Sequence, residues 1–352
     1  MYGINTERVD LKNSVERAEV ETFLQGFNLG LDSDVDYTII IRDRALHEPS
    51  IIATCSKAKS VLKSFAVREE LEGEGITSLL ISTLIDKLFE EGIYHSFVFT
   101  KPEKARIFSA LNFKLLHSNA DVALLENGIY DIQQAIEEMK NKYSIGDGAK
   151  AALVMNCNPF TLGHNYLIEE AAKNHLQVLV FIVEEDQSLF PFATRYELVC
   201  KGVAHLKNVQ VLPSGVYIIS SVTFPTYFIK EEGERLRAYA DLDASIFGKY
   251  FCSRFNITKR YLGQEPYCPV TAVYNETLKK VLPTYGVEVQ EIARKAFGEV
   301  PISASYVRKI LKDEGIHSEE LNHLLPQVTL DFLASNLGRE IVEKLKTSDS
   351  PN

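Results

Sequence analysis

The sequence lacks closely spaced cysteines. Its five cysteines are scattered along 352 residues, at positions Cys55, Cys157, Cys200, Cys252 and Cys268. They are too few for a disulfide framework, and the absence of any C-x-x-C pair argues against a zinc site. Because free thiols persist in reducing compartments, we expect a cytoplasmic protein.

An excess of basic residues and a long apolar run are also missing. The chain has 38 Lys and Arg against 48 Asp and Glu, which gives a net charge of −10. This balance argues against a general binder of nucleic acid or of membrane surfaces, but it allows a local basic pocket for a nucleotide. No apolar run is long enough to span a membrane, and the charged N-terminal segment lacks the apolar region of a signal peptide. We expect neither nucleic acid nor membrane among its partners.

Length and composition indicate a globular protein with more than one domain. The chain is 45% hydrophobic and 24% charged, and 352 residues suffice for two or three domains. We expect one domain over residues 1–126 and a second over 150–346. A connector over 127–149 joins them, and a polar tail covers 347–352.

The first domain has the periodicities of a mixed α+β fold. We expect helices over residues 5–30, 76–91 and 103–111, and strands over 37–41, 51–55, 61–67, 94–100, 113–116 and 122–125. Two glycines, Gly73 and Gly75, precede the second helix. A strand, a glycine-rich turn and a helix in this order favour an anion at the helix N-terminus.

This pattern resembles the GNAT N-acetyltransferase family over about the first third of the chain. In that family a Q/R-x-x-G-x-G/A loop holds the pyrophosphate of coenzyme A, so the resemblance implies that Gly73 and Gly75 bind such a group. Glu70 occupies the Gln/Arg position and departs from the pattern. Two glycines before a helix are also typical of a plain helix-starting turn, and this alternative remains open.

The second domain alternates strands and helices. We expect strands over residues 151–155, 177–184, 209–212, 259–262 and 287–292, and helices after His164 and over 194–206, 245–255, 270–282 and 302–311, with a helical tail over 318–346. The near-continuous apolar strands are typical of a buried parallel sheet. The pattern predicts a doubly wound, Rossmann-like parallel sheet with ligands at the carboxyl ends of its strands.

The segment after the first of these strands carries the strongest chemical signal. Asn156 and Asn158 precede Thr161-x-Gly163-His164, which opens a helix. The T-x-G-H pattern resembles the signature of nucleotidylyltransferases, which implies that His164 and Thr161 act on the α-phosphate of ATP. An imidazole, a hydroxyl and helix-terminal N–H groups can stabilise charge that develops on a phosphoryl group. We expect both asparagines and Gly163 to belong to the nucleotide site.

A second signature lies further along the chain, with its first serine, Ser303, 139 residues after His164. Ile302-Ser303-x-Ser305-x-x-Arg308 resembles the I-S-S/T-T-x-x-R motif of the same enzymes. The resemblance implies that Ser303 and Ser305 bind the β- and γ-phosphates and that Arg308 adds a cation with bidentate geometry. Both serines also suit plain helix N-caps, and the two roles are compatible.

Two further residues near the motifs have open roles. Arg195 follows an aromatic segment and suits either a cation for substrate or phosphate or a surface helix position. Cys157 lies inside the predicted active loop, where an acyl relay and a small buried residue are both compatible with the sequence.

The combination resembles the citrate (pro-3S)-lyase ligase family over essentially the whole chain. The segments N-x-N-P-F-T-x-G-H-x-Y-L-I-E (156–169) and F-P-T-Y-F (224–228) carry this resemblance together with the domain pairing. It implies that ATP, with Mg²⁺, adenylates acetate to acetyl-AMP. The acetyl group then passes to the thiol of phosphoribosyl-dephospho-coenzyme A on the acyl carrier (gamma) subunit of citrate lyase. The first domain would dock this prosthetic arm or complete the transfer.

Two other functions remain compatible with the sequence. The first is a nucleotidylyltransferase that adenylates a phosphorylated cofactor precursor. The second is a non-catalytic sensor of acetyl-coenzyme A or of a nucleotide, although the presence of both His164 and Arg308 speaks against it.

Overall fold

The computed structural model describes residues 5–43, 49–71, 75–186, 188–225, 234–298 and 300–347. The chain folds into two compact units, Met1–Asp131 and Ile132–Asn352. The boundary between them falls inside the segment expected to be a connector, at the start of helix α4 (Ile132–Lys142). Within the described ranges, no helix has both the length and the apolar character needed to cross a membrane.

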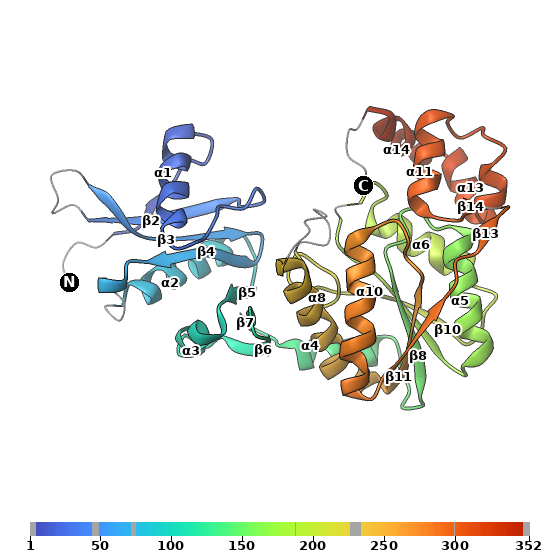
Figure 1. Ribbon diagram of the computed structural model, residues 1–352, viewed down its shortest axis with the longest axis horizontal. Coiled ribbons are helices and arrows are strands. Elements are labelled where there is room, and N and C mark those ends of the chain that lie inside the picture. The colour runs from blue at the N-terminus through green and yellow to red at the C-terminus, as the bar shows by residue number, and fades with distance from the viewer. Residues whose placement is uncertain are drawn as a thin grey trace. The chain divides into compact units, whose positions relative to one another are not determined.

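The N-terminal unit is built on one seven-stranded sheet (Figure 1). Its strands are β1 (Glu7–Arg8), β2 (Tyr37–Asp43), β3 (Ser50–Ala58), β4 (Val61–Val67), β5 (His95–Thr100), β6 (Lys114–Ser118) and β7 (Ala123–Gly128), in the order β1-β2-β3-β4-β5-β7-β6. All neighbours are antiparallel except β4 and β5. The expected α+β pattern of strand, turn, helix, strand, helix and strands is confirmed.

Helix α2 (Ile76–Glu90) connects the two parallel strands and packs its apolar side on the sheet. Its residues Ile76, Leu80, Leu84 and Leu88 belong to the buried core of this unit. Strands β4 and β5 pair only through Val61 with Phe97 and Leu62 with Val98, so the ladder ends early along both strands. The same unit also contains the short helix α3 (Ala105–Ser109).

The first helix is shorter than the sequence pattern predicts. Helix α1 spans Ser14–Gln25, because the side chain of Asn13 accepts a hydrogen bond from the Val15 N–H at 3.0 Å and begins the helix there. Residues 7–8 of the expected helix instead form β1, which pairs with β2. The expectation of a helix over 5–30 is therefore wrong at both ends.

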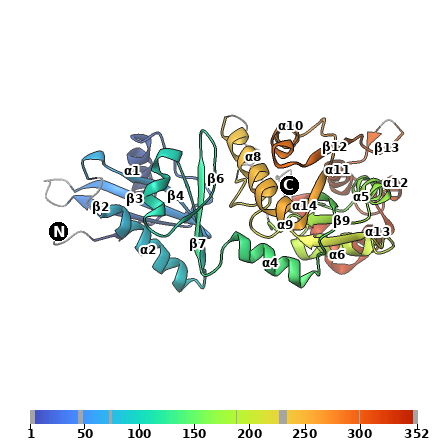
Figure 2. The same ribbon diagram turned by 90° about the horizontal axis from the view of Figure 1, so that it is seen from below.

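The C-terminal unit has a five-stranded, wholly parallel sheet (Figure 2). The strands are β8 (Lys150–Met155), β9 (Val178–Ile182), β10 (Val209–Pro213), β11 (Ile257–Gly263) and β12 (Glu288–Ile292), in the order β10-β9-β8-β11-β12. The expected doubly wound sheet is confirmed. Because β8 lies between β9 and β11, the strand order reverses at its carboxyl end, which is where such sheets bind ligands.

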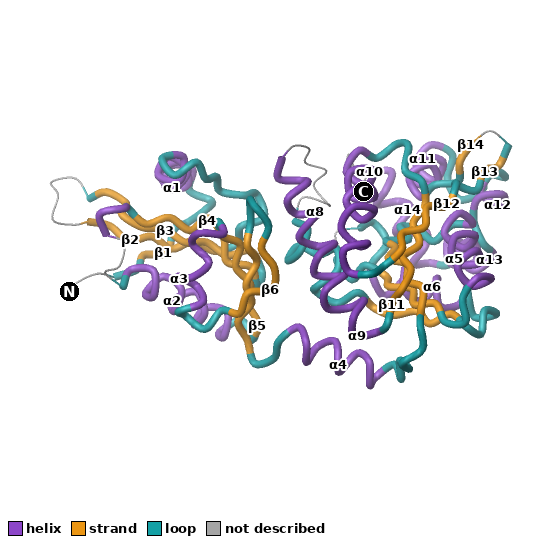
Figure 3. Tube along the Cα trace, turned by 60° about the horizontal axis from the view of Figure 1, so that its bottom comes forward, coloured by secondary structure: helices purple, strands orange, loops and turns teal. Residues whose placement is uncertain are grey.

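Helices cover both faces of this sheet (Figure 3). Helices α5 (Leu162–Asn174) and α6 (Phe192–Gly202) pack on one face, with Ile168, Ala171 and Leu198 in a buried cluster with β8 and β9. Helices α8 (Glu234–Ile246), α9 (Ser253–Phe255) and α10 (Pro269–Val281) belong to the opposite face, where Phe181 of β9 contacts Phe255.

The remaining helices extend the C-terminal part of the chain. They are α11 (Ala304–Asp313), α12 (Leu321–Leu324), α13 (Gln327–Ala334) and α14 (Asn336–Thr347), and a small hairpin of β13 (Ala296–Phe297) and β14 (Val300–Pro301) precedes them. The expected helical tail is thus three helices. Pro326 caps the second and Ser335 ends it, so the helical hydrogen bonds do not run through.

Candidate active site

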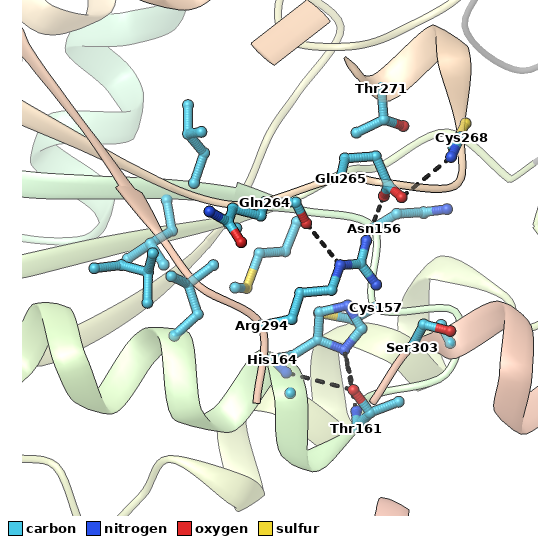
Figure 4. A pocket seen from close by; sticks show the side chains of 18 of the residues that line it. Asn156, Cys157, Thr161, His164, Gln264, Glu265, Cys268, Thr271, Arg294 and Ser303 are labelled. Atoms are coloured by element: carbon cyan, nitrogen blue, oxygen red, sulfur yellow. Dashed lines mark hydrogen bonds and ion pairs between the residues drawn. The ribbon is translucent and has the colours of Figure 1, made fainter. Parts of the chain in front are cut away.

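A cavity of about 330 Å³ opens at the reversal point of the parallel sheet (Figure 4). The loop after β8, the loop after β11 and the N-terminal turns of α5 and α11 all contribute to its wall. It therefore lies where the fold rule for open parallel sheets places a ligand. Eight of the expected site residues line it: Asn156, Asn158, Thr161, Gly163, His164, Ser303, Ser305 and Arg308.

Thr161 and His164 are locked together at the start of α5. The Thr161 N–H donates to Nδ1 of His164 at 3.1 Å, and the His164 N–H donates to Oγ1 of Thr161 at 3.4 Å. This reciprocal capping box satisfies two amides of the helix terminus. Because Nδ1 accepts a backbone proton, a neutral imidazole carries its own proton on Nε2.

His164 is held neutral by its surroundings. Burial lowers the pKa of His164 to about 4, and the positive charge of Arg294 acts in the same direction. At neutral pH the side chain is therefore a hydrogen-bond donor through Nε2 and carries no charge. The first amides of α5, at Leu162 and Gly163, have no preceding helical carbonyl to bind, and they add a positive partial charge at the same place.

Gly163 brings the two sequence motifs into contact. A Cβ atom at this position would lie 2.9 Å from the carbonyl oxygen of Ile302 and 3.5 Å from Oγ1 of Thr161. The absence of a side chain therefore lets the first turn of α5 approach the residue that precedes Ser303. Gly163 lines the cavity, and the group that it approaches in this structure is the backbone of the second motif.

The second motif forms the N-terminus of α11. Ser303 caps the helix, with Oγ accepting from the Tyr306 N–H at 3.1 Å, and its Oγ lies 3.2 Å from Oγ of Ser305. Arg308, one turn further, donates from Nη1 to the carbonyl oxygen of Asn158. Burial lowers the pKa of Arg308, but the guanidinium remains a cation. Ser303 therefore both caps α11 and lines the cavity.

Arg195 does not line the cavity. Its side chain is 0% exposed and donates to the carbonyl oxygens of Phe190 at 2.8 Å and Val183 at 2.7 Å. Nη1 also donates to Oδ1 of Asn156 at 2.9 Å. The structure differs here from both interpretations of the sequence, because Arg195 is neither on the surface nor in the cavity wall. It fixes the loop that carries Asn156.

Asn158 and Cys157 complete this loop in different ways. Oδ1 of Asn158 accepts from the Phe190 N–H at 3.0 Å, which ties the loop to the segment before α6. Cys157 is 1% exposed, and burial raises the pKa of its thiol to about 12. A thiol that stays protonated is a poor nucleophile, so the geometry favours the small buried residue over the acyl relay.

The cavity also contains charged residues that the motifs do not include. Arg294 and Lys295 follow β12, and Gln264 and Glu265 follow β11. Arg294 donates from Nε to the carbonyl oxygen of Gln264 at 2.6 Å and forms an ion pair with Glu265. The sequence does carry a signal for these four residues, because each is polar and lies just after a predicted parallel strand.

No ready-made metal cage is evident. Within the described ranges, no group of three or more His, Cys, Asp or Glu side chains could hold a metal ion. Glu265 is the one carboxylate among the described residues that line the cavity, and it is paired with Arg294.

The predicted coenzyme A turn of the N-terminal unit is described only in part. Gly75 begins α2 with φ +80° and no side-chain cap, and a Cβ there would meet no atom within 4 Å. Gly73 lies outside the described residues.

Comparisons with known proteins agree over nearly the whole chain. The family model of the citrate lyase ligase C-terminal domain matches residues 150–333. The citrate (pro-3S)-lyase ligase of Escherichia coli K12 is 35% identical over 336 residues, which cover 94% of each chain. That of Klebsiella pneumoniae is 33% identical over 92% of this chain and 94% of its own.

Solved structures match a smaller part of the chain. An acetyltransferase of the GNAT family from Staphylococcus aureus is 15% identical and covers 36% of this chain and 100% of its own, with a TM-score of 0.30. Escherichia coli ElaA is 11% identical and covers 36% of this chain and 99% of its own, also with a TM-score of 0.30.

Proposed function

Because the chain belongs to the citrate (pro-3S)-lyase ligase family, we propose that it uses ATP to acetylate the prosthetic thiol of the citrate lyase acyl carrier subunit. One observation carries the mechanism: the N-termini of α5 and α11 meet at a single cavity, and each has its motif in place. Two helix termini, one neutral imidazole and one cation suit a triphosphate.

The first step is adenylation of acetate. A carboxylate oxygen attacks the α-phosphorus, the new O–P bond forms, and the bond to the bridging oxygen of the β-phosphate breaks. Pyrophosphate leaves with the electron pair, and acetyl-AMP remains. Acetate is already an anion at neutral pH, so this step needs no general base, and the protein acts through position and charge.

Each motif has a separate part in this step. Nε2–H of His164 and the first amides of α5 face the negative charge that builds on the α-phosphoryl oxygens. Ser303, Ser305 and the terminus of α11 bind the β- and γ-phosphates, and Arg308 neutralises the departing pyrophosphate. Thr161 keeps the imidazole in the tautomer that donates.

The second step transfers the acetyl group. The carrier's thiolate sulfur attacks the acetyl carbon, the C–S bond forms, and the bond from carbon to the AMP oxygen breaks. AMP leaves, and the thiol proton passes to solvent. The protonated, buried Cys157 has no part in this proposal.

Mg²⁺ and the N-terminal unit have supporting roles. Magnesium keeps several waters and is bound mainly through substrate phosphates, which suits a cavity with one paired carboxylate. It would neutralise phosphate charge.

The N-terminal unit would dock the carrier's phosphopantetheine-like arm at the turn that opens α2, where Gly75 leaves the backbone accessible.

Exchange of labelled pyrophosphate into ATP tests the first step. We expect exchange that depends on acetate and does not require the carrier protein. No exchange with acetate, combined with turnover of a phosphomonoester, would identify a nucleotidylyltransferase of a phosphorylated precursor instead. No turnover of ATP with either class of substrate would favour a sensor.

A further inference from the structure

Arg294 is a cation in the cavity wall that belongs to neither motif. It lies two residues beyond the end of β12, lines the cavity, and its side chain is 21% exposed. Its positive charge contributes to the low pKa of His164. A charged side chain in the wall of the cavity interacts with the charge of any ligand that binds there.

Two groups from the loop after the neighbouring strand β11 fix the guanidinium. Nε donates to the carbonyl oxygen of Gln264 at 2.6 Å, and Nη2 pairs with the carboxylate of Glu265. Glu265 is itself held, because Oε1 accepts from the N–H groups of Tyr267 and Cys268, both at 3.1 Å. This loop runs from the end of β11 directly into α10, so the two partners of Arg294 lie on a short connection between regular elements.

One edge of the guanidinium remains available to a ligand. Nη1 of Arg294 makes no hydrogen bond to any residue in the described ranges. In Figure 4 this third nitrogen points away from Glu265, toward the part of the cavity that contains His164 and Ser303. The arginine therefore presents N–H donors to the same space as Nε2–H of His164.

The charge balance of the cavity favours an anion at this edge. Glu265 offsets the charge of one cation, but Lys295 and Arg308 also line the cavity. The reacting centre in the proposed step brings two anions together, a carboxylate and an α-phosphate. Their mutual repulsion opposes the attack, and a fixed cation between them lowers that cost.

We propose that Arg294 binds an oxyanion of the reacting centre through Nη1, and that Glu265 is the positioning residue that holds the guanidinium there. The oxyanion belongs to the acid's carboxylate or to the α-phosphate, which share this chemistry. This inference rests on the proposed adenylation step. It assigns to the site a contact that lies outside both sequence motifs.

Arg294→Gln tests the contact in the full-length protein. We expect kcat of acetate-dependent pyrophosphate exchange to fall by about 100-fold, the usual effect of losing one oriented donor. A raised KM for acetate assigns the contact to the carboxylate, and a raised KM for ATP assigns it to the α-phosphate. Arg254→Gln is the matched control, because Arg254 is exposed, pairs with Glu137 and does not line the cavity.

A second readout does not depend on turnover. NMR titration of His164 in Arg294→Gln should show a raised pKa, because a neighbouring positive charge has been removed. The double variant Arg294→Gln/Glu265→Gln should be no slower than Arg294→Gln alone if Glu265 acts only through the arginine. If Arg294→Gln keeps the wild-type kcat and both wild-type KM values, the proposal is overturned. If the double variant is slower than Arg294→Gln alone, the role given to Glu265 is overturned.

Failure of the proposed function gives a different result. In that case the wild-type protein shows no exchange with acetate. Equilibrium dialysis then measures the affinity of the wild type and of Arg294→Gln for ATP, in place of the kinetic test. A roughly tenfold weaker affinity in Arg294→Gln then supports an α-phosphate contact. Unchanged affinity overturns the proposal.

Discussion

The two units each begin a helix after a strand, and the two helix starts are built differently. In the C-terminal unit α5 begins at Thr161, whose side chain and partner His164 satisfy each other's backbone. In the N-terminal unit α2 begins at Gly75, which has no side chain and makes no side-chain cap. The start of α5 supplies an imidazole and a hydroxyl, whereas the start of α2 offers only backbone groups. This difference suits catalysis at one terminus and docking of an anionic arm at the other.

The largest effect on activity is expected at the start of α5, which depends on the side chain of His164. His164→Ala removes the Nε2–H donor, and we expect kcat of pyrophosphate exchange to fall at least about 100-fold, or ~3 kcal/mol of transition-state stabilisation. The lost half of the capping box costs only about 1 kcal/mol of folding stability. Exchange rates and thermal unfolding of the same preparation measure both terms. A large loss of stability with a normal kcat would make His164 a cap and not a catalytic group.

A smaller effect is expected where the two motifs meet. Gly163→Ala places a Cβ 2.9 Å from the carbonyl oxygen of Ile302, so α5 and α11 must separate. Overpacking of this kind costs about 1–3 kcal/mol, and we expect roughly a tenfold rise in KM for ATP. Gly146→Ala is the control, because a Cβ at Gly146 meets no atom within 4 Å. Equal effects of the two substitutions would contradict the proposed contact between the motifs.

The bare helix start in the N-terminal unit can be tested against the other end of the same helix. Gly75 and Gly92 flank α2 with φ +80° and φ +75°, and neither has an atom within 4 Å of an added Cβ. Asn tolerates this backbone conformation, so Gly75→Asn and Gly92→Asn should cost similar, small amounts of stability. We expect only Gly75→Asn to slow transfer of acetyl to the carrier, by about three- to tenfold.

Pyrophosphate exchange should be normal in both of these variants, since the reaction is proposed for the other unit. The assay therefore separates the two steps. If Gly92→Asn slows the transfer as much as Gly75→Asn, the turn has no specific role in docking.

The sequence predicts most of what depends on local pattern. Apolar runs predict the five parallel strands, and the second motif predicts that Ser303 caps a helix, as it does. The helix expected after His164 begins earlier, at Leu162, because Thr161 caps it. Local signals fail where a cap competes with periodicity, as Asn13 does for α1. They fail again for Arg195 and Arg294. Burial of the first and the pairing of the second with Glu265 depend on which strand ends are neighbours, and only the sheet order supplies that information.

The last prediction concerns the dependence of stability on pH and returns to the capped helix start. The folded protein holds the pKa of His164 at about 4, below the ordinary value of 6.5. Between these values the unfolded chain binds a proton that the folded protein does not, so stability rises with pH from about 4 to 6.5 and is unaffected by this group above that range. His164→Asn removes the titration but keeps an acceptor for the Thr161 N–H. We expect the unfolding temperature of the wild type to fall more steeply than that of His164→Asn as the pH is lowered from 6.5 to 4. Parallel curves would mean that the imidazole is as well solvated as any surface histidine, and the two helix starts would then differ only in shape.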